Sequence, residues 1–268
     1  MIINGQRILI TGAAGGIGSE LTLALAAKGA ELILVDLDAN KLRQLKQTAF
    51  ERGCKTHVFP CDLAAPDASH KLTEAILDEV GGIDILINCA GITSFGQFQA
   101  QTPESIEKLW RINVIAPMQL TRELLPSMTA RRSGRIVNVG SIFGSIGFAY
   151  FATYSASKFA MRGFSEALRR ELEDTEVGVT YVAPRYTKTP LNNGAVSKMA
   201  QAVGMNGDEP SVVAQHVVRA IEKDSTDYYI GWPECLFVRI NAVLPRLVDG
   251  ELRKQNAQAR PFATNASP

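Results

Sequence analysis

The chain has 268 residues, of which 46% are hydrophobic and 21% are charged, and its formal net charge is +1. This composition predicts a globular protein with a large core, and the balanced charge argues against nucleic-acid binding as its main function. The four cysteines form no Cys-x-x-Cys pair and the three histidines lack ligand spacing, so neither a disulfide framework nor a metal site is expected. We expect a cytoplasmic enzyme, because no signal-peptide pattern follows Met1 and no apolar run is long enough to span a membrane.

Short apolar runs alternate with amphipathic helical patterns along most of the chain. Strands are expected at 7–11, 31–36, 56–59, 84–88, 135–139, 179–182 and 228–231, and helices near 16–28, 39–52, 67–79, 103–130, 153–174 and 211–223. This alternation predicts βαβ units in a single doubly wound α/β domain over residues 1–235, with a seven-stranded, mostly parallel sheet and helices on both faces. Ligands of such sheets bind beyond the carboxyl ends of the strands.

A glycine-rich stretch, Thr11-Gly12-Ala13-Ala14-Gly15-Gly16-Ile17-Gly18, lies between the first strand and the first helix. Glycines let the backbone approach a pyrophosphate, and amides at a helix N-terminus meet its charge. The alternative is a plain strand-to-helix turn. We expect a dinucleotide site here, with contacts from Thr11, Gly12, Gly15, Gly16, Ile17 and Gly18.

Asp36 ends the second strand, about twenty residues beyond the glycines, where an acid can bind the adenosine ribose hydroxyls. Its charge would repel the extra phosphate of NADP, so Asp36 favours NAD over NADP as the cofactor. The alternative is a turn residue at the strand end, although Asp38 is placed to cap the following helix.

Further candidates follow the third and fourth strands. Asp62 and its neighbour Leu63 are expected at the adenine, although a turn or cap role fits Asp62 equally well. The stretch from Asn88 through Ala90 to Gly91 carries an amide and small residues that let a flat ligand approach. Asn113 lies among apolar neighbours in the long helix that Thr102 and Pro103 should begin, where nearby backbone could satisfy its amide.

Ser141 follows the fifth strand, and Tyr154 comes thirteen residues later with Lys158 four residues beyond it. Residues four apart share one face of a helix, so the Lys158 ammonium should lie beside the Tyr154 phenol and lower the pKa of that phenol. A tyrosine of lowered pKa can transfer protons near neutral pH. The alternatives are a solvated helix face for the Tyr-Lys pair and a backbone-capping role for Ser141.

Together, the residues from Thr11 to Gly18 with Asp62, Asn88 to Gly91, Asn113, Ser141, Tyr154 and Lys158 resemble the short-chain dehydrogenase/reductase family over residues 5–235. The resemblance implies a Rossmann-type fold and a catalytic tetrad of Asn113, Ser141, Tyr154 and Lys158, of which Tyr154 and Lys158 also contact the cofactor. It implies cofactor contacts from Pro184, Thr187 and Thr189, and a homodimer or homotetramer formed through the two long helices. Cys89 and Arg185 depart from the family pattern, and Arg185 stands where glycine is usual.

Three loops, at about 92–98, 142–151 and 185–210, are expected to bind the substrate. Apolar and soft side chains concentrate there: Phe95, Phe98, Ile142, Phe143, Phe148, Tyr150, Phe151, Met199 and Met205. They fit a bulky hydrophobic alcohol or ketone of steroid, prenyl or acyl type, although core packing explains many of them. Residues 191–207 include Asn192-Asn193-Gly194, which suits a mobile lid.

The tail, residues 236–268, is expected to be an amphipathic helical extension of the same domain. Apolar residues recur at helical spacing, arginines step along another face, and Pro245 should kink or restart the helix. We favour packing on the chain's own domain or on a partner subunit. The alternative is weak contact with a membrane surface that would collect a lipid-soluble substrate.

Hydride transfer between NAD(H) and a hydrophobic secondary alcohol or ketone is the function that this sequence favours. Ser141 would bind the substrate oxygen, Tyr154 would act as general acid and base, and Asn113 would fix a water that relays protons from Lys158. An NADPH-dependent 3-oxoacyl reductase is an alternative that Asp36 disfavours. A non-catalytic NAD-binding regulatory protein is another alternative, against which the complete tetrad argues.

Overall fold

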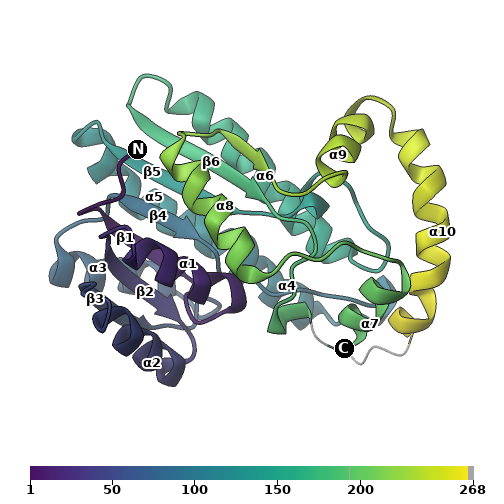
Figure 1. Ribbon diagram of the computed structural model, residues 1–268, viewed down its shortest axis with the longest axis horizontal. Coiled ribbons are helices and arrows are strands. Elements are labelled where there is room, and N and C mark those ends of the chain that lie inside the picture. Colours follow the sequence, from purple (N-terminus) through teal and green to yellow (C-terminus); the bar gives the residue numbers. More distant parts are fainter. Residues whose placement is uncertain (193, 265–268) are drawn as a thin grey trace.

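A seven-stranded sheet forms the centre of the molecule in the computed structural model, which describes residues 1–192 and 194–264 (Figure 1). Its strands are β1 (Arg7–Thr11), β2 (Glu31–Asp36), β3 (Thr56–Pro60), β4 (Ile85–Asn88), β5 (Gly134–Val139), β6 (Val177–Ala183) and β7 (Asp227–Tyr229). They follow the order β3-β2-β1-β4-β5-β6-β7, and every neighbouring pair is parallel. The predicted doubly wound α/β fold is confirmed.

Helices cover both faces of the sheet. One face carries α1 (Gly16–Ala26), α2 (Ala39–Phe50) and α8 (Pro210–Glu222), and the other carries α3 (Ala68–Val80), α5 (Ala116–Ala130) and α6 (Ala152–Glu171). Alternate residues of a strand point to opposite faces, so Ile8 and Ile10 pack in the first layer while Leu9 packs in the second. All three are fully buried, as the continuous apolar runs of a doubly covered parallel sheet predict.

The remaining elements complete the chain. They are α4 (Pro103–Trp110), α7 (Ala195–Ala202), α9 (Glu234–Val243), α10 (Pro245–Thr264), the single turns η1 (Phe98–Ala100), η3 (Ile142–Gly144) and η4 (Pro190–Asn192), and a π turn, η2 (Arg111–Ile115). Asp38 caps α2 by accepting from the amides of Asn40 and Lys41, and Thr102 caps α4 ahead of Pro103. Both predicted caps are confirmed, and α10 restarts the tail at Pro245 as expected.

The strand order reverses between β1 and β4, which places the site. The chain moves outward from β1 to β2 and β3 on one side, then returns to continue from β4 on the other. The loops that leave the carboxyl ends of β1 and β4 therefore diverge and leave a crevice between them. The glycine-rich loop follows β1 and the Asn88–Gly91 segment follows β4, so both border this crevice.

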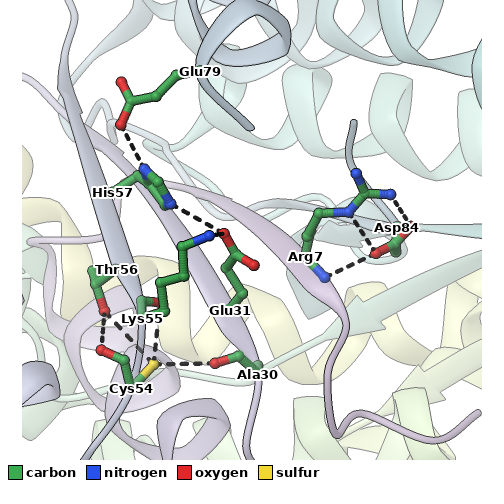
Figure 2. Close-up of polar contacts among 9 residues, drawn as sticks. All are labelled: Arg7, Ala30, Glu31, Cys54, Lys55, Thr56, His57, Glu79 and Asp84. Atoms are coloured by element: carbon green, nitrogen blue, oxygen red, sulfur yellow. Dashed lines mark hydrogen bonds and ion pairs between the residues drawn. The ribbon is translucent and has the colours of Figure 1, made fainter. Parts of the chain in front are cut away.

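The opposite, amino edge of the sheet is held by charged pairs (Figure 2). Arg7, the first residue of β1, donates to Asp84 just before β4, with Nη2 2.9 Å from Oδ1. His57 of β3 lies between two carboxylates, with Nε2 3.0 Å from Glu31 and Nδ1 2.5 Å from Glu79. These contacts fix the starts of neighbouring strands far from the crevice.

The tail packs on the chain's own domain, as favoured from the sequence. Val238 of α9 and Val248 of α10 share a buried cluster with Ile146, and Ala259 of α10 packs with Phe148. Figure 1 shows α9 and α10 as a hairpin on one side of the molecule, with α7 close to α10. No helix in the described part of the chain is long and apolar enough to cross a membrane.

Candidate active site

The glycine-rich loop between β1 and α1 requires its glycines for close packing. Gly12 has a φ of +67°, and a Cβ there would lie 2.6 Å from Ala90 Cα, so the loop touches the segment after β4. A Cβ at Gly16 would lie 2.7 Å from Thr189 Cγ2, so the same loop also touches the segment after β6. Helix α1 begins at Gly16 with no side chain capping its first amides. Backbone amides there can therefore meet an anionic group.

Asp36 stands at the carboxyl end of β2, beside this loop. Its Oδ2 accepts from the Ala14 amide at 3.0 Å and its Oδ1 accepts from the Asp38 amide at 3.1 Å. The carboxylate is half-buried, and each oxygen retains further acceptor capacity. Asp62 is exposed, accepts from the Ala64 amide at 2.9 Å and so forms a turn, while Leu63 packs partly into the core.

Thr11 and Asn88 support the floor of the crevice from inside the sheet. The Thr11 hydroxyl accepts from the amides of Cys89 and Ala90, both at 3.2 Å, and the Thr11 side chain is buried. Asn88 Nδ2 donates to Asn138 Oδ1 at 2.8 Å. The Thr11 hydroxyl and the Asn88 Nδ2 are therefore engaged with protein partners, whereas the buried Asn88 Oδ1 has no hydrogen-bond partner among the described residues.

Asn113 lies in a π turn that interrupts the predicted helix 103–130. Residues 103–130 are helical as predicted, but the π turn η2 lies between α4 and α5. The turn directs Asn113 inward, where Oδ1 accepts from the Ile92 amide and Nδ2 donates to the Ile92 carbonyl, both at 2.9 Å. Asn113 Nδ2 also donates to Ser157 Oγ at 3.1 Å, and this oxygen in turn donates to the Tyr154 carbonyl at 2.7 Å. Ser157, which the sequence did not single out, thus links Asn113 to α6.

Ser141 and Tyr154 come together at the carboxyl edge, as predicted. Ser141 follows β5 and begins η3, where its Oγ accepts from the Phe143 amide at 3.1 Å. Tyr154 lies in the first turn of α6, with its ring edge against the Phe143 ring. Burial raises the pKa of Tyr154 to about 12, and a hydrogen bond with the Ser141 side chain offsets part of that rise.

Lys158 lies one turn further along α6 but does not lower the pKa of Tyr154 in this structure. Its ammonium is 5.6 Å from the centroid of the Tyr154 ring, and Nζ donates to the Val139 carbonyl at 3.2 Å. The side chain is only 6% exposed, and this burial lowers the pKa of Lys158 to about 8. The predicted acidic phenol is therefore wrong for this structure, because burial of the phenol is the largest cause of its shift and Lys158 is not among the groups that lower its pKa.

Gly91 marks where Asn113 and Lys158 meet. A Cβ at Gly91 would lie 3.4 Å from Asn113 Oδ1 and 3.6 Å from Lys158 Nζ. The structure therefore brings all four predicted tetrad residues to one end of the sheet. Within residues 1–192 and 194–264, no group of three or more His, Cys, Asp or Glu could hold a metal ion.

The segment after β6 closes the crevice on the far side. Pro184, Thr187 and Thr189 are all buried, and the Thr187 hydroxyl donates to the Arg185 carbonyl at 3.1 Å. The Arg185 guanidinium binds both Asp208 oxygens, at 2.9 and 2.8 Å, and Glu234 at 3.1 Å. Arg185 therefore joins the two ends of the 185–208 segment to the start of α9, which explains how the chain accommodates arginine where the family has glycine.

One cleft of about 470 Å³ connects these elements. Ser141, Tyr154, Thr187 and Thr189 line it together with the following predicted substrate residues: Ile142, Phe143, Phe148, Phe151, Met199 and Met205. Phe95 and Phe98 do not line it, because Phe95 packs behind it against Phe151 and Phe98 is 62% exposed. Tyr150 likewise lies outside this cleft.

The tail supplies a wall of the cleft that the sequence did not predict. Its contribution comes from both helices: Phe237, Ile240, Leu247, Val248 and Leu252. Helix α7 adds Val196 and Met199 across from them, in the segment expected to be a lid. Asn193, part of the predicted lid hinge, lies outside the described residues, and the mobility of the lid stays a prediction.

The geometry defines a crevice suited to a dinucleotide that opens into an apolar cleft with a Ser-Tyr-Lys cluster, and the chain belongs to the short chain dehydrogenase family, whose pattern matches residues 6–200. The resemblance inferred from the motifs is thereby confirmed. Dehydrogenase/reductase SDR family member 7B of Bos taurus is 34% identical, over 94% of this chain and 83% of its own length. Ketoacyl reductase HetN of a Nostoc strain is also 34% identical, over 85% of this chain and 79% of its own length.

Solved structures agree with this assignment. A metagenomic short-chain oxidoreductase, solved in complex with NADP, is 29% identical and superposes with a TM-score of 0.73. The match covers 86% of this chain and 97% of that protein. The family and the Rossmann-like fold are therefore established together, and this chain is an oxidoreductase of the short-chain dehydrogenase/reductase type.

Proposed function

We propose that the protein transfers hydride between a nicotinamide cofactor, with NAD preferred, and a hydrophobic secondary alcohol or its ketone. The observation that carries this proposal is an apolar cleft that is lined by Ser141, Tyr154 and Ile17 of the glycine-rich loop. Its volume of about 470 Å³ is in the range of small-molecule sites. A steroid-, prenyl- or acyl-like substrate suits the apolar walls.

The residues present fit a dinucleotide. Gly12 and Gly16 lie so close to Ala90 and Thr189 that no side chain fits at either position, so the loop offers backbone amides to an anion. We assign the pyrophosphate to the loop from Gly12 to Gly18 and to Thr189, and the adenosine ribose to Asp36. The bound cofactor would supply or accept the hydride. In the same proposal Asp62 and Leu63 contact adenine, and Asn88, Ala90, Gly91, Pro184 and Thr187 complete the cofactor site.

The protein's own residues would transfer the proton to or from the substrate oxygen. Ser141 Oγ would donate to the substrate oxygen, and Tyr154 Oη would give a proton to that oxygen in reduction or take it in oxidation. Because the pKa of Tyr154 is about 12, the phenol is the resting form and is ready to donate. Asn113 Oδ1 accepts one bond from protein and can accept a second from a water, through which Lys158 would exchange protons with solvent.

Asp36 is the residue that favours NAD. A carboxylate beside the glycine-rich loop repels a ribose phosphate, and both of its oxygens are already oriented by backbone amides. The metagenomic relative was solved with NADP, so the preference must come from this chain's own residues. We expect Asp36→Ala to lower the ratio of kcat/KM with NAD to kcat/KM with NADP by about tenfold or more, because the substitution removes the repulsion between this carboxylate and the ribose phosphate of NADP.

A panel of alcohols and ketones, assayed by nicotinamide absorbance with NAD(H) and NADP(H) in parallel, tests the proposal. We expect turnover of bulky apolar substrates with NAD(H). Preferred use of NADPH on 3-oxoacyl thioesters would support the alternative, 3-oxoacyl reduction, which the name of the Nostoc relative favours. Binding of NADH without turnover of any substrate would instead support a non-catalytic regulatory protein.

Association and membrane contact belong to the same proposal. Exposed Met118 of α5 and Phe159 of α6, 38% and 43% accessible, support a homodimer or homotetramer formed through the two long helices. Light scattering tests this, and a monomer at micromolar concentration would contradict it.

Val243, Leu244 and Leu247 are exposed where α9 meets α10, and these apolar side chains support the proposed weak contact with a membrane surface. Flotation with anionic vesicles tests this contact, which absence of co-flotation would contradict.

A further inference from the structure

Tyr181 lies beneath Ser141 and binds both of its backbone groups. It occupies the middle of β6 and is fully buried. Its hydroxyl donates to the Ser141 carbonyl oxygen at 3.1 Å and accepts from the Ser141 amide at 3.3 Å. A single side chain therefore fixes the peptide groups on both sides of the Ser141 Cα.

The loop that carries Ser141 is built around the Tyr181 ring. A Cβ at Gly140 would lie 2.2 Å from Tyr181 Cε2, and a Cβ at Gly144 would lie 2.4 Å from Tyr181 Oη. Both glycines are thus needed to let the backbone approach the ring this closely. The fit means that the ring sets the path of residues 140–144, while the hydroxyl sets the orientation of the Ser141 peptide groups.

The phenol is suited to a permanent structural hydrogen bond. Burial raises the pKa of Tyr181, and the hydrogen bond from the Ser141 backbone opposes only part of that rise, so the hydroxyl keeps its proton and can donate. Tyr229 packs its ring edge against Tyr181 at 6.4 Å between centroids. The Tyr229 hydroxyl reaches Ser145 rather than Ser141. The two tyrosines therefore share one layer but hold different residues of the loop.

The orientation of Ser141 matters for the proposed chemistry. Ser141 and Tyr154 line the same cleft, the Ser141 side chain offsets part of the rise in the pKa of Tyr154, and the Ser141 Oγ accepts from the Phe143 amide. A rotation of the Ser141 backbone would move Oγ away from both Tyr154 and the substrate oxygen. We propose that Tyr181 is a positioning residue that holds Ser141 in the orientation in which its hydroxyl meets Tyr154 and the substrate. This inference rests on the proposed function.

Tyr181→Phe tests it, because the ring remains between Gly140 and Gly144 while the hydroxyl is lost. We expect kcat to fall about tenfold with KM for the cofactor unchanged, because a slightly misplaced group loses catalysis rather than binding. Tyr229→Phe is the matched control and should resemble the wild type in both respects.

Hydrogen exchange of the peptide covering residues 140–146 gives a readout that does not need turnover. Tyr181→Phe should exchange faster there than the wild type, whereas Tyr229→Phe should not lose protection at the Ser141 amide. Wild-type kcat and wild-type exchange in Tyr181→Phe would overturn the inference. A wild type inactive on every substrate would defeat the proposed function instead, and exchange would still decide whether Tyr181 holds Ser141.

Discussion

The amino edge of the sheet and the catalytic cluster of Ser141, Tyr154 and Lys158 differ in whether their charged groups have partners of opposite charge. At the amino edge, Arg7 is matched by Asp84 and His57 lies between two carboxylates (Figure 2). At the carboxyl edge, the buried Lys158 ammonium donates to the Val139 carbonyl, and its nearest aromatic neighbour is the Tyr154 ring. Burial therefore shifts the pKa of Lys158 down and that of Tyr154 up.

This difference in charge pairing indicates which charged residues stabilise the fold and which serve the reaction. A charge with a close partner of opposite sign stabilises the fold, whereas a buried ammonium without one disfavours it. Groups of strongly shifted pKa cluster where proteins perform chemistry, and proteins keep them there at the expense of stability. We therefore expect substitutions at the carboxyl edge to reduce activity and those at the amino edge to reduce stability.

Lys158→Met should give the largest effect on turnover and the opposite effect on stability. We expect kcat to fall by about 10²- to 10⁴-fold. Near pH 7 the free energy of unfolding should rise by about 1–3 kcal/mol, because a buried ammonium with its pKa lowered from 10.5 to about 8 is removed. Denaturant titration measures this change, and Lys71→Met, at an exposed position, is the control.

The stability gain of Lys158→Met should depend on pH. Between about pH 8 and 10.5 the unfolded wild type binds more protons at Lys158 than the folded wild type, so wild-type stability rises with pH there. The advantage of the variant should therefore shrink across this window. If the variant is less stable than the wild type at pH 7, then the buried Lys158 ammonium stabilises the fold, which would contradict the claim that it reduces stability.

Arg185→Gly should have an intermediate effect, confined to substrate binding. The change leaves the half-buried carboxylates of Asp208 and Glu234 without their shared guanidinium, which loosens the segment that closes the cleft. We expect KM for the substrate to rise about tenfold with a smaller change in kcat. Lys188→Ala removes an exposed pair with Glu209 on the same segment and should leave KM unchanged. Equal KM values for Arg185→Gly and the wild type would contradict the proposal that Arg185 holds the segment that closes the cleft.

Asp84→Asn should leave turnover unchanged and lower stability by about 1–3 kcal/mol, because the Arg7 guanidinium loses its charged partner. Although burial alone would raise the pKa of Asp84, hydrogen bonds from Arg7 bring it below the ordinary value of 3.8. This contribution is present above pH 4 and is lost as pH falls through the lower, folded value. Thermal unfolding at pH 7 and pH 3 should thus show a difference from wild type that narrows in acid.

The sheet and its covering helices could be predicted because they follow from local patterns. The apolar run at Ile8 to Ile10 and the caps at Asp38 and Thr102 belong to single segments, so the sequence carries them directly. The π turn at Asn113 could not be predicted, because it depends on the distant backbone of Ile92.

In the site, too, some features follow from local sequence patterns and others depend on the assembled fold. The positions of Ser141 at a strand end and Tyr154 at a helix start were sufficient to place them together, and the family resemblance added Asn113. The pKa values of Tyr154 and Lys158 depend on how deeply the assembled fold buries them. The tail as a wall of the cleft depends on which distant surface an amphipathic helix meets. Tyr181 has the pattern of an ordinary core residue in a strand, and only its contact with Ser141 distinguishes it.

The turnover of Tyr154→Phe, measured alongside its affinity for NADH, tests most directly whether Tyr154 transfers the proton. The substitution removes one hydroxyl and keeps the ring that packs against Phe143. We predict a kcat at least about 10²-fold below that of the wild type and a dissociation constant for NADH within about twofold of it. A kcat close to that of the wild type would contradict the assignment of Tyr154 as the general acid and base.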